Sequence, residues 1–342
     1  MENEGRAKAV SVAANPLSNA KDLLRRAVTS SLFVVVCLLF AVWTVGALIA
    51  PAMLQKENLI NVFRNSAITG TFALAATCVL LVGEIDLSLG PTMVFALIMG
   101  STLYETTSDV IMIFAMLLSG ALLGLFNGVI VAVFKVKSLM ATLGTFSLYG
   151  GLAYLLSSGK VVLFYQAPRF LWLGRGMVGS VPVPVIFALA VLAVMYVVLQ
   201  FTKFGREVYF TGANPLAAWL SGVNVRRIKL LMFVVSGFVS SLAGVFQAAL
   251  FNELGPSYVS GGYEMTGLSI AIFGGVSMAG GKGSVLSTAV ASLTFQLLLN
   301  ILTLTGMGTY MEQVFKGIFL IVVVISFQRL EVKRYSKLGA AA

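Results

Sequence analysis

The sequence predicts an all-α protein that crosses a membrane about ten times. Of its 342 residues, 58% are apolar and 11% are charged, whereas about a quarter of the residues in a soluble domain are charged. Long apolar runs recur along the chain, and about 20 apolar residues suffice for a helix to cross the hydrocarbon core. The 34 glycines fit this class, because glycine lets membrane helices approach closely.

Ten apolar segments can be drawn along the chain. The first, fourth, sixth, seventh and tenth are well defined. The third, eighth and ninth are short or interrupted by glycine, which indicates broken or tilted helices. The segments are 28–50, 60–83, 87–104, 109–134, 139–157, 181–201, 228–251, 264–281, 283–303 and 310–328.

The placement of charge predicts an orientation. With ten spans, most of the 23 lysines and arginines fall on the side of the N-terminus, which the positive-inside rule makes cytoplasmic. We therefore expect a cytoplasmic segment 1–27, a membrane domain 28–328, and a cytoplasmic tail 329–342. The longest cytoplasmic connection is then 202–227, and the longest external one is 158–180. The net charge of +10 is explained by this topology, so we expect no nucleic-acid partner.

The composition argues against enzyme chemistry and against a metal site. The chain has no histidine, the commonest general base and metal ligand. Cys37 and Cys78 both lie in apolar runs, where we expect them to act as small buried apolar residues rather than a disulfide. We predict no catalytic residues, no bound metal and no directly bound cofactor.

Two acids stand at the junction of the second and third segments. Glu84 and Asp86 follow one apolar run and precede another, where ionisable groups are costly and suggest function. They indicate either a polar kink beside a transport path or a structural cap, in which Asp86 or Ser88 accepts hydrogen bonds at a helix beginning near Leu87. Thr142, within the fifth segment, fits either a polar path or interhelical hydrogen bonding.

The cytoplasmic connection predicts a short helix. Asn214 is suited to cap it, Pro215 to occupy its first turn and Gly222 to end it. This helix is either a docking element for a soluble partner or a connector lying on lipid headgroups.

Two further stretches suggest local structure. Residues 280–284 fail the spacing of a phosphate loop and predict a tight cytoplasmic turn. In the external connection, Phe164, Phe170 and Trp172 indicate a piece lying in the membrane interface. The glycine-rich ends of 70–90 and 264–284 share a faint similarity that is compatible with duplicated halves or with coincidence.

Five blocks of sequence resemble one family. They are Gly83-x-Ile85-Asp86-Leu87-Ser88-x-Gly90, Ala141-Thr142-Leu143-Gly144-Thr145, the stretch 204–225, Gly274-Gly275-x-Ser277 with Gly280-Gly281-x-Gly283-Ser284, and Val314-x-Lys316-Gly317. In this order they resemble permeases of the ribose, xylose and arabinose ABC importer class, a carbohydrate-uptake group akin to branched-chain permeases. Glu84 stands where that family usually has glycine.

The resemblance implies the membrane-spanning subunit of a bacterial inner-membrane importer for a sugar-like solute. A second permease copy or a paralogue would complete the path through the lipid bilayer. A separate ATP-binding subunit would hydrolyse ATP, and an extracytoplasmic solute-binding protein would deliver the solute. It implies coupling to the ATPase through Gly205, Arg206, Gly212, Asn214, Ala217, Ala218, Ser221 and Gly222. It also implies a signature or path formed by Glu84, Asp86, Ser88, Thr142, Thr145, Gly274 and Gly275.

Other functions remain open from the residues. A secondary transporter or channel for a small polar solute is one, although a coupled carrier usually needs intramembrane ionisable groups and few deep acids occur here, namely Glu84, Asp86 and Glu264. An ABC permease for autoinducer-2 or another non-sugar solute is a second.

Overall fold

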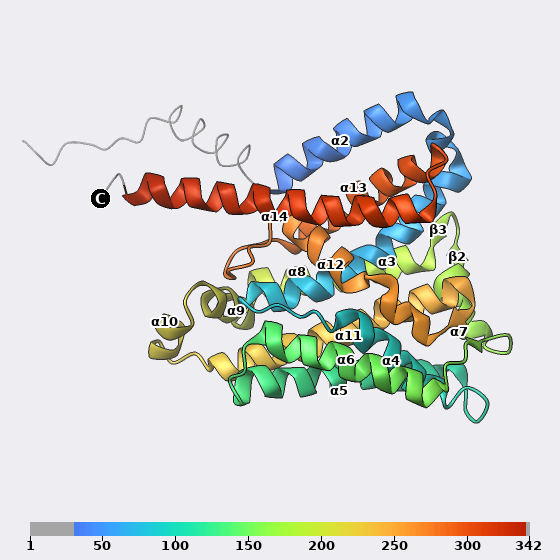
Figure 1. The fold of residues 1–342 in the computed structure, drawn as a ribbon, viewed down its shortest axis with the longest axis horizontal. Coiled ribbons are helices and arrows are strands. Elements are labelled where there is room, and N and C mark those ends of the chain that lie inside the picture. The colour runs from blue at the N-terminus through green and yellow to red at the C-terminus, as the bar shows by residue number, and fades with distance from the viewer. Residues whose placement is uncertain (1–30, 340–342) are drawn as a thin grey trace, which may run out of the picture.

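A computed structural model describes residues 31–339, and it confirms the all-α prediction. Thirteen α-helices fill this part of the chain (Figure 1). Its strands are four pieces of two residues each: β1 (Val162–Leu163) pairs antiparallel with β4 (Glu253–Leu254), and β2 (Met177–Val178) pairs antiparallel with β3 (Val181–Pro182).

Ten of the helices follow the ten predicted segments. They are α2 (Ser31–Ile49), α3 (Lys56–Leu81), α4 (Leu89–Ser101), α5 (Asp109–Gly128), α6 (Ser138–Ser157), α8 (Val183–Phe201), α11 (Val225–Phe251), α12 (Tyr263–Phe273), α13 (Val285–Leu304) and α14 (Thr309–Gly339).

Shorter elements join them. They are the 3-10 helix η1 (Pro51–Leu54), the π-helical turn η2 (Val129–Val133) that continues α5, α7 (Pro168–Arg175), α9 (Lys203–Ala213), α10 (Pro215–Leu220) and the 3-10 helix η3 (Pro256–Gly261).

Six helices of the described chain are long and apolar enough to cross a membrane: α2, α5 with η2, α6, α8, α11 and α13. The third and eighth segments are short as predicted, because α4 has 13 residues and α12 has 11. The prediction of a broken ninth segment is wrong, since α13 is one continuous helix of 20 residues and the glycines precede it. The protein is a multi-pass membrane protein, and the count of ten spans stays a prediction.

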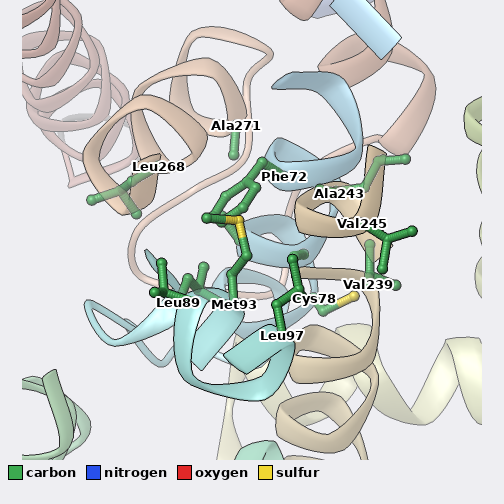
Figure 2. Packing of buried hydrophobic residues seen from close by; sticks show 14 of the residues in the cluster. Phe72, Cys78, Leu89, Met93, Leu97, Val239, Ala243, Val245, Leu268 and Ala271 are labelled. Atoms are coloured by element: carbon green, nitrogen blue, oxygen red, sulfur yellow. The ribbon is translucent and has the colours of Figure 1, made fainter. Parts of the chain in front are cut away.

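The core lies around α3 and α11. Both helices are buried over most of their length. Phe72 of α3, Met93 of α4 and Leu268 of α12 belong to one large cluster of buried residues (Figure 2). The short helices α4 and α12 therefore lie inside the protein, where neighbouring helices cover them.

Large apolar side chains face outward on the peripheral helices. Phe40 of α2, Phe114 of α5 and Leu155 of α6 are 66%, 65% and 75% exposed. Apolar side chains exposed in this number suit a surface that lipid covers. Cys78 is buried as predicted, but Cys37 is exposed on α2, since that helix buries only Val35 and Gly46.

The two long connections lie at opposite ends of the helix bundle. In Figure 1, α9 and α10 lie at one end together with the C-terminal end of α14, and α7 lies at the other end with β2 and β3. Trp172 of the external connection is 47% exposed, and the location of this piece in the membrane interface stays a prediction. Phe164 and Phe170 themselves do not face outward. Both rings are fully buried with centroids 4.4 Å apart, because this connection is tied to the core through β1–β4 pairing and a hydrogen bond from the Phe164 N–H to Asn252 Oδ1.

Candidate coupling junction and signature loop

The loop between α3 and α4 is held by a buried chain of hydrogen bonds. Asp86 Oδ1 accepts hydrogen bonds from the Ser88 N–H at 2.9 Å and from the Ser88 hydroxyl at 2.6 Å. The Ser88 hydroxyl accepts from the Asn127 amide at 2.7 Å, and the Tyr149 hydroxyl donates to Asn127 Oδ1 at 3.2 Å. These four side chains join the loop to α5 and α6.

Neither Asp86 nor Ser88 caps α4 with its side chain, so the capping interpretation is wrong. The structure starts α4 at Leu89 with Ser88 as the N-cap residue, and the Ser88 side chain makes no capping hydrogen bond. Asp86 instead accepts the free N–H of Ser88 just before the helix. Ser88 was misassigned because its hydroxyl is already engaged by Asp86 and Asn127.

Helix α6 holds the backbone of the same loop. The Leu87 N–H donates to Thr142 Oγ1 at 3.2 Å, and the Ile85 N–H donates to Ser138 Oγ at 3.1 Å. Thr145 is buried one turn further along and donates to the Thr142 carbonyl at 3.3 Å. Asp86, Ser88 and Thr142 therefore hold the same loop, and their part in a translocation path stays a prediction. Their side chains are buried and bonded to the protein.

Glu84 points away from this network. Its carboxylate forms a salt bridge with Lys229 in the second turn of α11, and both side chains are largely buried. The partner of Glu84 was not identified from the sequence, because 145 residues separate the two.

The predicted cap and end of the short helix are confirmed. Asn214 Oδ1 accepts from the Ala217 N–H at 3.0 Å, and Pro215 occupies the first turn of α10. Gly222 follows the helix with a φ of +84°, a conformation that favours glycine. Ser221 is the exposed C-cap residue.

Helix α9 begins with a tight turn from α8. Thr202 caps it by accepting from the Gly205 N–H at 3.2 Å. Gly205 lies so close to α8 that a Cβ there would be 2.1 Å from the Leu199 carbonyl oxygen. Arg206 is exposed beside it.

Helix α10 presents large apolar side chains to its surroundings. Leu216, Trp219 and Leu220 are 65%, 64% and 71% exposed. Ala218 is fully buried and Ala217 is half-buried, so Ala218 faces the protein. The exposed triplet was missed from the sequence, although its i, i+3, i+4 spacing marks one helix face.

Three segments that contain glycine meet at the C-terminal end of α9. We call this place the glycine junction, and it consists of Leu81, Gly83, Gly212, Gly280 and Gly281. The Gly281 N–H donates to the Leu81 carbonyl at 2.9 Å. A Cβ on Gly280 would be 2.6 Å from the Gly83 nitrogen, and one on Gly212 would be 1.9 Å from the Leu81 carbonyl oxygen. Backbone therefore packs on backbone at this junction, with no side chain between the segments.

The turn 274–284 completes this arrangement. Within it, residues 280–284 form a tight turn as predicted, with positive φ at Gly280, Gly281 and Gly283. The Tyr209 hydroxyl of α9 donates to the Gly283 carbonyl at 3.1 Å, and burial raises the pKa of Tyr209 above its usual value. Gly274 and Gly275 lie outside the junction: Gly274 packs on the backbone of Thr288 in α13, and Gly275 lies beside Ser31.

The short helices α4 and α12 meet at their N-terminal ends. Glu264, in the first turn of α12, is 5% exposed, and a Cβ on Gly90 would be 2.3 Å from its carboxylate. Both glycine-rich stretches compared in the sequence also meet, at Gly83 and Gly280. Whether the halves are duplicated stays a hypothesis.

Long apolar helices around two short buried helices define a multi-pass membrane protein. The family model described as "Branched-chain amino acid transport system / permease component" matches residues 58–324. The chain belongs to this permease family, which confirms the resemblance found in the motifs. Its members are transport permeases rather than enzymes.

Several import permeases are similar to the chain. The ribose import permease RbsC of Haemophilus influenzae is 32% identical over 84% of this chain and 90% of its own length. RbsC of Escherichia coli K12 is 31% identical over 81% and 87%, and the xylose/arabinose import permease XylH of Sulfolobus acidocaldarius is 31% identical over 81% and 79%. No solved structure matches the chain.

Proposed function

We propose that this chain is the permease subunit of an ATP-driven ABC importer for a sugar or sugar-like solute in the bacterial inner membrane. The similar proteins named above are import permeases for ribose and for xylose or arabinose, and they are matched over most of their length. The observation that carries the mechanism is the exposed apolar face of α10, which is connected through α9 to the glycine junction.

The proposed partners follow from the two ends of the bundle. An ATP-binding subunit would dock on Leu216, Trp219 and Leu220 of α10, which places α9, α10 and both termini in the cytoplasm. A solute-binding protein would dock at the opposite end, near α7. A second copy of the chain or a paralogue would complete the translocation path.

The glycine junction supports a mechanism in which ATP acts at a distance. ATP binding to the partner subunit would move α10 and α9, and the contact between Gly212 and Leu81 would pass the motion to the end of α3. The loop 83–88 would follow, and its hydrogen bonds to Thr142 and Asn127 would extend the motion to α6 and α5. ATP must then bind the inward-open and outward-open arrangements with different affinity.

The docking face can be tested by copurification. The ATP-binding subunit, co-expressed with the chain, is expected to copurify with wild type and to be lost with Trp219→Asp, because a carboxylate would be buried against an apolar partner surface. Trp172→Asp is the matched control, since Trp172 is also exposed, at 47%, but lies on α7. Retention of the subunit by Trp219→Asp would contradict the proposed docking face.

A further inference from the structure

A basic pocket lies beside the loop between α3 and α4. It is distinct from the glycine junction. It has a volume of about 480 Å³ and is lined by the end of η2, the start of α6, the start of α11 and Glu84. Its charged lining residues are Lys135, Lys137, Arg226, Lys229 and Glu84. The pocket therefore gathers four cations and one acid from three segments of the chain.

The charges of the pocket are not balanced within the protein. Glu84 pairs with Lys229. Among the described residues, Lys135, Lys137 and Arg226 form no salt bridge. Three like charges around one cavity repel one another, and an anion in the cavity would relieve that repulsion.

The backbone holds the lysines in place. Lys135 has a φ of +58°, a conformation that costs free energy for a residue other than glycine. The adjoining turn is closed by a hydrogen bond from the Val136 N–H to the Ile130 carbonyl at 3.3 Å. This turn directs both Lys135 and Lys137 to the pocket, while Arg226 approaches from α11.

An apolar rim adjoins the basic pocket. Phe134, Leu139 and Met140 flank the two lysines in the sequence and are 72%, 46% and 68% exposed. A charged cavity beside exposed apolar side chains at the end of membrane helices suits a ligand with an anionic head and apolar tails. Arginine recognises phosphate through two parallel hydrogen bonds, and lysine adds a compact charge.

We propose that this pocket binds the phosphate of an anionic phospholipid headgroup. The acyl chains would lie along Phe134 and Met140, and the phosphate would bond to Arg226 and Lys137. Inorganic phosphate has the same charged group as the phospholipid but no acyl chains. Contacts with the apolar rim should therefore make the phospholipid bind more tightly than inorganic phosphate.

Native mass spectrometry of the purified full chain in neutral detergent tests this proposal. Phosphatidylglycerol is titrated in one arm, phosphatidylcholine in a second and inorganic phosphate in a third. We expect one tightly bound phosphatidylglycerol, and at least about tenfold weaker binding of both phosphatidylcholine and phosphate.

Neighbouring arginines provide a matched pair of variants. Arg226→Gln is expected to weaken phosphatidylglycerol binding by about tenfold or more. Arg227→Gln removes the same charge from the next residue, which is exposed and does not line the pocket, and it is expected to bind like wild type. Equal weakening by both variants would overturn the proposal, because it would indicate a diffuse charge effect. Phosphate binding as tight as lipid binding would overturn the lipid assignment.

A gain of affinity provides a test that misfolding cannot imitate. Glu84→Gln removes the carboxylate that pairs with Lys229. The positive charge of Lys229 is then unpaired and faces the pocket. We expect phosphatidylglycerol to bind several-fold more tightly to Glu84→Gln than to wild type. Unchanged or weaker binding would overturn the proposal, because a headgroup in this pocket must respond to the charge released on Lys229.

Discussion

Gly212 of α9 packs directly against the carbonyl oxygen of Leu81 at the end of α3, and no side chain would fit at position 212. A methyl group on Gly212 would lie 1.9 Å from that oxygen, far inside van der Waals contact. The two helices cannot relax independently there, because the nearest atoms are backbone atoms on both sides. This contact joins the connection 202–227 to the end of α3 in the core.

Gly212→Ala is therefore expected to destabilise the protein and to impair transport. Overpacking by one methyl group typically costs about 1–3 kcal/mol, which a thermal unfolding measurement in detergent would detect as a lower Tm. Solute uptake should fall as well, because the end of α3 must shift. Gly151→Ala is the control, since Gly151 is helical and has no atom within 4 Å of an added Cβ. Equal Tm values for the two variants would refute the close contact.

Asp86 is expected to stabilise the loop as a hydrogen-bond acceptor. Asp86→Ala would leave the buried N–H and hydroxyl of Ser88 without their acceptor, and each unsatisfied buried group costs about 1–3 kcal/mol. Asp86→Asn keeps an acceptor oxygen, so it should recover most of the lost Tm. If Asn and Ala lowered Tm equally, the negative charge of Asp86 would matter and the purely structural role would be wrong.

Much of this architecture could be predicted because a helix that crosses a membrane needs a long run of apolar residues, which is visible in the sequence. The ten apolar segments correspond to ten helices, and the cap at Asn214 follows from local backbone chemistry. The interruption assigned to the ninth segment was wrong because its glycines belong to the preceding turn. Local sequence patterns assign residues to helices and turns. The close backbone contacts of the junction glycines depend on segments distant in the sequence, so they could not be predicted.

In the candidate site, too, local motifs identified some residues, whereas their partners depend on tertiary packing. Asp86, Ser88 and Thr142 were singled out by sequence motifs, and they do come together. The partners of the network, Asn127 and Tyr149, lie in other helices, and no spacing in the sequence connects them. The salt bridge of Glu84 with Lys229 depends on the packing of α11 against α3 in the same way.

Gly90 and Glu264 are expected to be coupled. Gly90→Ala would place a methyl group 2.3 Å from the Glu264 carboxylate, which should lower Tm. Combining it with Glu264→Ala removes the obstructing carboxylate, so the double variant should be more stable than the sum of the two single effects predicts. Thermal unfolding of wild type, both single variants and the double variant measures this coupling. Additive effects would show that the two residues do not touch.

Asn214 is expected to control coupling to ATP without affecting the rest of the fold. Helix α10 has only six residues, and the Asn214 cap holds its first turn. Replacing an N-cap asparagine with alanine costs about 0.5–2 kcal/mol, enough to leave so short a helix partly unfolded. The apolar side chains of Leu216, Trp219 and Leu220 would then lose their common face, while the core around α3 and α11 would not change.

Asn214→Ala should therefore reduce solute-stimulated ATP hydrolysis in membranes that contain the assembled importer, with the Tm of the purified chain close to that of wild type. Asn214→Ser keeps a capping oxygen and should retain most of the stimulation. The comparison separates the cap from any direct contact of the amide with a partner, because serine replaces only the cap. Full stimulation of ATP hydrolysis in Asn214→Ala would show that an ordered α10 is not required for coupling.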